Sequence, residues 1–134
     1  MNRLDTNEVA ALQSPILATI AAQHNTDDNQ LLTQMVLRTS SSTGAVYVDD
    51  KTNPTSLVYL LLGTYGMLAE ASCVVAASEN ASGEYSTHFM AAKQFAKEKM
   101  CKSLIVGDFS GSGKEALIEK LGSPTNVNIQ VQTL

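Results

Sequence analysis

The sequence predicts a single α/β domain in which helices flank a mixed β-sheet. Apolar residues recur at helical spacing through the first 40 residues, and strand-like apolar runs begin at residue 44. The second half alternates strand-like and helix-like segments. A chain of 134 residues fits one domain and can bury a core without disulfides. We therefore expect a helical N-terminal part over residues 1–40, followed by the sheet over residues 41–134.

The N-terminal part is predicted to contain helices on either side of residue 25. Apolar residues between positions 9 and 20 follow a helical period, and Pro15 among them should break or restart the helix. Thr26 or Asp27 can cap a further helix, which should end at the serine-rich turn that follows it.

Five strands and two more helices are expected in the rest of the chain. The strands are predicted over 44–50, 56–65, 66–78, 102–109 and 126–134. The helices are predicted over 87–100 and 113–121, while the residues 67–71 could equally be helical. The side chains expected to share one core are Val106, Ile129 and Val131 in the sheet, with Phe89, Phe95 and Leu117 packed on it.

Composition and charge exclude several classes of function. A net charge of -4 argues against nucleic-acid binding, and the basic residues gathered over 93–102 are typical of a solvated helix face. Only 16% of the residues are charged, which suits a protein packed against protein partners, such as those of a larger assembly. The N-terminus has no signal pattern and no apolar run is long enough to span a bilayer, so we expect an intracellular (cytoplasmic) or packaged protein that is not secreted.

Candidate metal ligands are few. Cys73 and Cys101 have no His or Cys at ligand spacing, so we expect no zinc site and two buried thiols in a reducing compartment. Asp49 and Asp50 are adjacent in a strand and point to opposite faces, which favours a turn-forming role over a shared metal ion.

The stretch SLIVGDFSGSGKEALIEKLG, residues 103–122, has the order of a phosphate-binding loop: strand, glycine-rich turn, helix. Counted from Gly107, however, Ser112 stands where the second glycine belongs, and Gly113 and Lys114 arrive one residue late. Glu115 occupies the position of the required hydroxyl. We therefore predict a tight strand-to-helix turn without a nucleotide.

Two stretches together resemble a known family. GAVYVDDKTNPTSLVYLLLGTYGMLAEA contains a strand that ends in Asp before an Asn-Pro turn, and HFMAAKQFAKEKMCKSLIVGDFSGSGKEALIEKLGSPTNVNIQVQTL contains a long helix, a strand, a short helix ending in KLG and a last strand. This order is similar to that of the GNAT (GCN5-related) N-acetyltransferases, over residues 41–134. The resemblance implies a GNAT-like mixed sheet and, in active members, acetyl-CoA as the cofactor.

The resemblance also implies where the cofactor would be held. In the family, a loop of pattern Arg/Gln-x-x-Gly-x-Gly/Ala opens the long helix, and its N–H groups bind the pyrophosphate. The matching stretch here is NASGEY, so the candidate cofactor-binding residues are Asn80, Ser82, Gly83 and Tyr85. Asn80 replaces the Arg or Gln, Tyr85 replaces a small residue and is expected to obstruct the loop, and Glu84 adds a negative charge.

The catalytic positions implied by the family are poorly matched. Ile118 falls near the position of a tyrosine that serves as the general acid, and isoleucine donates no proton. Glu70 is the one candidate base, since a carboxylate in an apolar setting has a raised pKa. A surface or strand role for Glu70 is the alternative. His88 is interpreted as a capping or surface histidine, and His24 as an exposed one.

Three hypotheses follow for the function. The leading one is a GNAT-like domain without catalysis that serves as a structural or binding module and needs no cofactor. Because phages carry small GNAT-like proteins beside their virion genes, a phage virion is one setting that the resemblance implies. The alternatives are an active acetyl-CoA-dependent N-acetyltransferase and an unrelated α/β protein-interaction domain.

Overall fold

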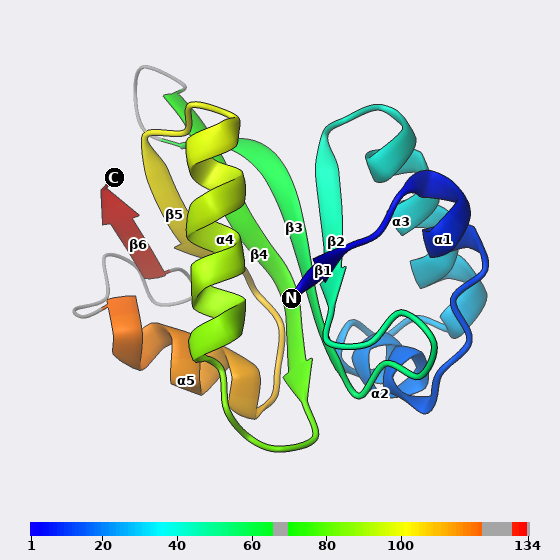
Figure 1. Cartoon of the computed structure of the whole chain (residues 1–134). Helices are drawn as coiled ribbons and strands as arrows, with labels where there is room; N and C mark the ends of the chain where they lie inside the picture. The colour runs from blue at the N-terminus through cyan, green and yellow to red at the C-terminus, as the bar shows by residue number, and fades with distance from the viewer. Residues whose placement is uncertain (66–69, 122–129, 134) are drawn as a thin grey trace.

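The computed structural model describes residues 1–65, 70–121 and 130–133; at 65 and 130–133 it describes the backbone alone. These residues form a six-stranded mixed sheet with the strands in the order β1-β2-β3-β4-β5-β6. Three N-terminal helices cover one face of the sheet, and α4 and α5 cover the other (Figure 1). The predicted α/β class with a mixed sheet and flanking helices is confirmed.

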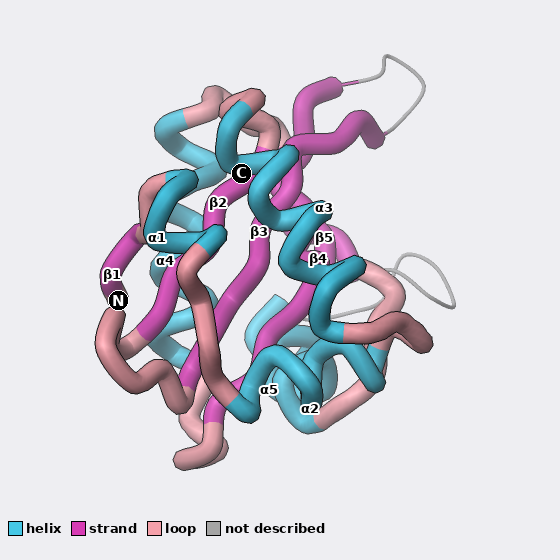
Figure 2. The backbone as a smooth tube through the Cα atoms, turned by 90° about the vertical axis from the view of Figure 1, so that its right-hand side faces the viewer, coloured by secondary structure: helices cyan, strands magenta, loops and turns pink. Residues whose placement is uncertain are grey.

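The N-terminal helices are α1 (Thr6–Ala10), α2 (Pro15–Gln23) and α3 (Asp28–Ser40), and they lie together on one side of the strands (Figure 2). Pro15 is the first residue of α2, so the expected restart of the helix is confirmed. Asp27 caps α3 by accepting the N–H of Gln30. Strand β1 (Asn2–Arg3) pairs antiparallel with β2 and was not predicted, because two residues are too few to show a period.

The centre of the sheet is built from β2 (Gly44–Val48), β3 (Ser56–Tyr65) and β4 (Glu70–Asn80), which pair antiparallel in sequence order. Helix α4 (Ser86–Glu98) then returns the chain to β5 (Ser103–Val106), which lies parallel to β4. Helix α5 (Ser112–Leu121) precedes β6 (Gln130–Thr133), and β6 is antiparallel to β5.

The parallel pair β4–β5 ends well before β4 does. Its register stops at Val75 and Val106, and the N–H of Gly107 makes a last bond to the carbonyl of Val75. A register shift between β3 and β4 lies at the same level, where Ala76 has no partner of its own. Strand β4 continues to Asn80, so its last residues separate from the chain that follows β5.

Each face of the sheet has its own core. The core under α4 and α5 contains the predicted Val106, Phe95 and Leu117, with Phe89 partly buried against it. Of the other two core predictions, Ile129 lies outside the described residues, and the structure describes only the backbone of Val131. The core under α1–α3 contains Ile20 and Met35, both fully buried.

The two cysteines, Cys73 and Cys101, lie in the core under α4 and α5. Both are buried and free, as expected. The Sγ of Cys73 donates to the carbonyl of Ala92 at 3.7 Å. Burial raises the pKa of both thiols above the ordinary value, so they stay protonated near pH 7 and are poor nucleophiles.

Candidate functional site

The loop between β4 and α4 contains the predicted cofactor-binding residues and is organised by Asn80. The amide oxygen of Asn80 accepts the backbone N–H and the hydroxyl of Ser82 at 3.0 and 3.1 Å, and its NH₂ donates to the carbonyl of Glu84 at 2.5 Å. Gly83 has a φ of 77°, with open space where a side chain would be. The polar groups of Asn80 are therefore used within the loop itself.

Tyr85 does not obstruct the surface of this loop, so that expectation was wrong. Its side chain points into the protein, where it is 4% exposed. The hydroxyl lies 3.0 Å from the Oγ of Ser112 and accepts the N–H of Asn80 at 3.2 Å. The ring is 5.2 Å from the imidazole of His88 in an edge-on arrangement. Tyr85 thus connects the start of α4 to the start of α5.

Helix α5 makes a second close contact in the same region. A Cβ on Gly113 would lie 2.0 Å from the carbonyl oxygen of Ser78 and 3.0 Å from the ring of Tyr85. The first turn of α5 therefore rests directly on the part of β4 that has separated from β5. Only glycine allows this approach, which explains the glycine in the GSGK sequence without a phosphate.

The stretch 103–121 forms the predicted strand, turn and helix. The Nζ of Lys114, in the first turn of α5, lies 3.4 Å from a carboxylate oxygen of Asp108 in the loop before the helix. The lysine of the GSGK sequence thus has an anionic partner in the preceding loop. That no nucleotide binds here stays a prediction.

His88 is fully buried, contrary to the surface or capping role expected for it. Its Nε2 lies 2.5 Å from the Oγ of Ser56 on β3, and its Nδ1 lies 2.7 Å from the Oγ of Ser78 on β4. A neutral imidazole donates to one hydroxyl and accepts from the other. Burial lowers the pKa of His88 to about 4, so the ring is neutral near pH 7. Its spacing from Ala91, Ala92 and Phe95, which are buried, was the available sequence signal.

The candidate base Glu70 lies far from the loop. It is the first residue of β4 and is exposed, so it lacks the apolar setting that a catalytic carboxylate would need. The loop follows Asn80 at the other end of the same strand, about 30 Å away at the usual rise per strand residue. Ile118 is partly buried against the core of α4 and α5.

Asp49 has the turn-forming role that was predicted for it. One carboxylate oxygen accepts the N–H groups of Thr55 and Ser56, and the other accepts the hydroxyl of Thr55. Partial burial works to raise the pKa of Asp49, but these hydrogen bonds outweigh it and hold the pKa below its ordinary value. Within residues 1–65, 70–121 and 130–133, no cluster of His, Cys, Asp and Glu could hold a metal ion.

An open groove lies between the end of α2 and the turn that precedes α5. Residues of both sides line it, among them Gln23, His24, Asp108, Phe109 and Lys114. The Nε2 of Gln23 donates to Glu79 at 2.7 Å, whereas its Oε1 is buried without a partner. The Nε2 of His24 is likewise buried and unpartnered, and its ring stacks on Phe109 at 6.1 Å.

His24 is therefore partly buried in this groove, and the expectation that it is exposed was wrong. The Oγ atoms of Ser72 and Ser103 are also buried without a protein partner, but only Gln23 and His24 among these residues line the groove.

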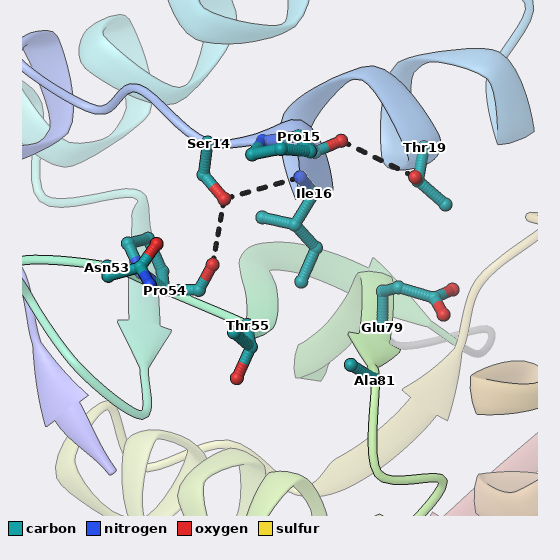
Figure 3. Close-up of a pocket in the computed structure, with 9 residues that line it drawn as sticks. All are labelled: Ser14, Pro15, Ile16, Thr19, Asn53, Pro54, Thr55, Glu79 and Ala81. Atoms are coloured by element: carbon teal, nitrogen blue, oxygen red, sulfur yellow. Dashed lines mark hydrogen bonds between the residues drawn. The ribbon is translucent and has the colours of Figure 1, made fainter.

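Two further hollows are less informative. The pocket in Figure 3 lies between the start of α2, the turn before β3 and the end of β4. The hydroxyl of Ser14 donates to the carbonyl of Pro54 at 2.7 Å and accepts the N–H of Ile16, so its polar capacity is used in joining these elements. A shallow groove beside the start of α4 is lined by Gly83, Ser86 and Lys120, among others.

The fold is that of known acetyltransferases. The structure is similar to that of a probable acetyltransferase (14% identity, TM-score 0.63, 94% of this chain and 90% of the other). It is also similar to a predicted acetyltransferase from Clostridium acetobutylicum, solved with acetyl-CoA (10% identity, TM-score 0.67, 94% and 90%). A third similar structure is the ribosomal-protein-alanine N-acetyltransferase from Brucella melitensis biovar Abortus 2308 (12% identity, TM-score 0.64, 93% and 91%).

The chain therefore has a GNAT-like fold, as the resemblance implied. At identities of 14% or less, these similarities concern the fold alone. No protein-family model matches the sequence, and no curated protein resembles it significantly. Among the described helices, none is long and apolar enough to cross a membrane.

Proposed function

We propose that the protein is a GNAT-like binding module without acetyltransferase activity. The observation that carries this proposal is the contact of the first turn of α5 with β4. In open α/β sheets, ligands bind in the crevice beyond the carboxyl ends of neighbouring parallel strands. Here Tyr85, Ser112 and Gly113 pack together in the interior where β4 separates from β5, and this packing supports a site without a cofactor arm.

The chemistry around this space supports the same proposal. Asn80 donates to the carbonyl of Glu84 within the loop, so its side chain is held away from a phosphate-binding role. Glu84 places a carboxylate beside the helix start where a pyrophosphate would have to lie. Glu70 is at the far end of β4 and cannot reach a thioester held at this loop. Ile118 cannot act as a general acid.

The binding capacity of the module is assigned to the groove of Gln23 and His24. The Oε1 of Gln23 is a fixed acceptor because its amide nitrogen is held by Glu79. Both atoms are covered, so a ligand in the groove would reach them by displacing neighbouring side chains, and its hydrogen-bonding groups would then satisfy the Oε1 of Gln23 and the Nε2 of His24. A role within a larger assembly, such as a phage virion, stays a prediction, which mass spectrometry of purified particles would test.

An active N-acetyltransferase is the second candidate, and one observation favours it. Tyr85 is the N-cap residue of α4, and its side chain makes no capping hydrogen bond. The first N–H groups of α4 are therefore not capped by a side chain at the N-cap position. The groove beside them is lined by Lys120 together with Glu84 and Glu119. The helix start and Lys120 favour an anion, whereas the two carboxylates oppose one.

Calorimetry with acetyl-CoA separates the two candidates. The proposal predicts no binding at cofactor concentrations of about 1 mM, equivalent to less than about 4 kcal/mol of binding free energy. It also predicts that Tyr85→Ala, which opens the space between β4 and α5, creates measurable binding, whereas Tyr47→Phe, a change in the same core away from the loop, does not. Micromolar binding by the native protein, or release of CoA thiol from acetyl-CoA with an amine present, would establish the enzyme instead.

A further inference from the structure

The outer face of α4 combines exposed methionines with lysines in one row. Met90, Lys93 and Lys97 follow at intervals of three and four residues, so they share a side of α4, and Met100 lies in the turn two residues beyond the end of the helix. Met90 is 68% exposed and Met100 is 80% exposed, and both lysines are exposed. We refer to these four residues as the α4 row.

The backbone at Met100 has a conformation that is unfavourable for a residue with a side chain. Its φ is 57°, which places it in the left-handed conformation just beyond the helix end, where glycine is preferred. Any side chain in this conformation is less favourable than glycine, because its Cβ approaches the following carbonyl oxygen. Since Met100 is exposed, burial within the chain does not offset that strain.

The charge around the row is positive although the protein is acidic overall. Lys93, Lys97 and the nearby Lys99 and Lys102 account for four of the nine basic residues of a chain with a net charge of -4. Glu98 is the one acidic residue among them, and Arg3 pairs with it at 2.6 Å. The lysines of the row are therefore not neutralised by their own helix.

We propose that the α4 row docks an acidic protein segment that carries apolar side chains. The lysines match carboxylates, and the flexible thioether side chains adapt to apolar residues of varied shape. From residue 90 to residue 97 the helical part of the row spans about 10 Å, which fits about two turns of a partner helix. The negative net charge disfavours a nucleic-acid or anionic-lipid partner. This surface is separate from the groove of Gln23 and His24, and its test does not depend on that groove.

The probe is a fluorescein-labelled amphipathic peptide of about twelve residues with Leu on one face and Glu on the other. Fluorescence anisotropy should show saturable binding that weakens with added salt, and none to the same peptide with Lys in place of Glu. Lys93→Glu with Lys97→Glu should weaken binding about tenfold or more. Met90→Ser with Met100→Gly should weaken it about fivefold without lowering the melting temperature, because a glycine at the second position removes the backbone strain.

The matched control is Leu37→Ser with Arg38→Glu, which removes an exposed hydrophobic residue and a cation from α3 on the opposite side. Its affinity should equal that of the native protein. The proposal is overturned if the native protein does not bind the Glu peptide, or if the control loses as much affinity as the α4 variants. Capture by phosphatidylserine vesicles that depends on Lys93 and Lys97, without peptide binding, would also overturn it and assign the row to a membrane surface.

Discussion

Acidification should destabilise the protein through His88 before the carboxylates titrate. The pKa of this imidazole is about 4 in the folded state, against 6.5 as its ordinary value. The unfolded chain therefore takes up a proton between these values while the folded protein does not, and stability falls as the pH falls through that window. Each pKa unit corresponds to about 1.4 kcal/mol, so about 3 kcal/mol is lost by pH 4, and about 2 kcal/mol of it between pH 7 and pH 5.

Urea unfolding followed by circular dichroism at pH 7, 6 and 5 measures this loss. The matched variant is His88→Gln, which can keep a hydrogen bond to Ser56 but carries no titrating group. It should be less stable than the native protein at pH 7 by about 1–3 kcal/mol, because Ser78 loses its partner. Its stability should then be almost flat down to pH 5. The account of a neutral buried imidazole is refuted if the variant loses as much stability as the native protein, or if only His24→Gln flattens the profile.

Four other substitutions test the close contact at α5, the cap of α3 and the core under α4. Gly113→Ala should destabilise the protein by several kcal/mol in thermal unfolding, since its methyl group would meet the carbonyl of Ser78, whereas Gly83→Ala should cost only about 1 kcal/mol for its backbone conformation. Asp27→Ala should cost about 1 kcal/mol in urea unfolding by removing the cap of α3. Phe95→Ala should cost about 3–5 kcal/mol, because its side chain is fully buried in the core under α4.

The sequence predicted the elements well where a period was long enough to read. The helical pattern before residue 40 and the restart at Pro15 were both visible in it. It could not show β1, because two residues carry no pattern. The sequence also could not show where β4 separates from β5, because that point depends on where the pairing of the two strands stops.

Side-chain roles were predicted less well, because they depend on tertiary contacts. Tyr85 was expected at the surface of a cofactor loop because a motif fixes position along the chain and not the direction of a ring. His88 was expected in water because it is polar, although it lies on the buried side of α4 and two serines from distant strands satisfy it. Such partners, Ser56 and Ser78, can be identified only once the strands are placed beside the helix.

Residues 107–114 resemble a phosphate-binding loop because both use glycine for the same steric reason. A loop uses glycine wherever its backbone must come close to another group, and a phosphate and a carbonyl oxygen make the same steric demand. At Gly113 the group is the carbonyl of Ser78, so the motif reflects a packing contact. A binding site has to be argued from polar groups that the fold leaves unsatisfied. Our proposed site rests on such atoms at Gln23 and His24, whereas the amide of Asn80 makes hydrogen bonds within its own loop.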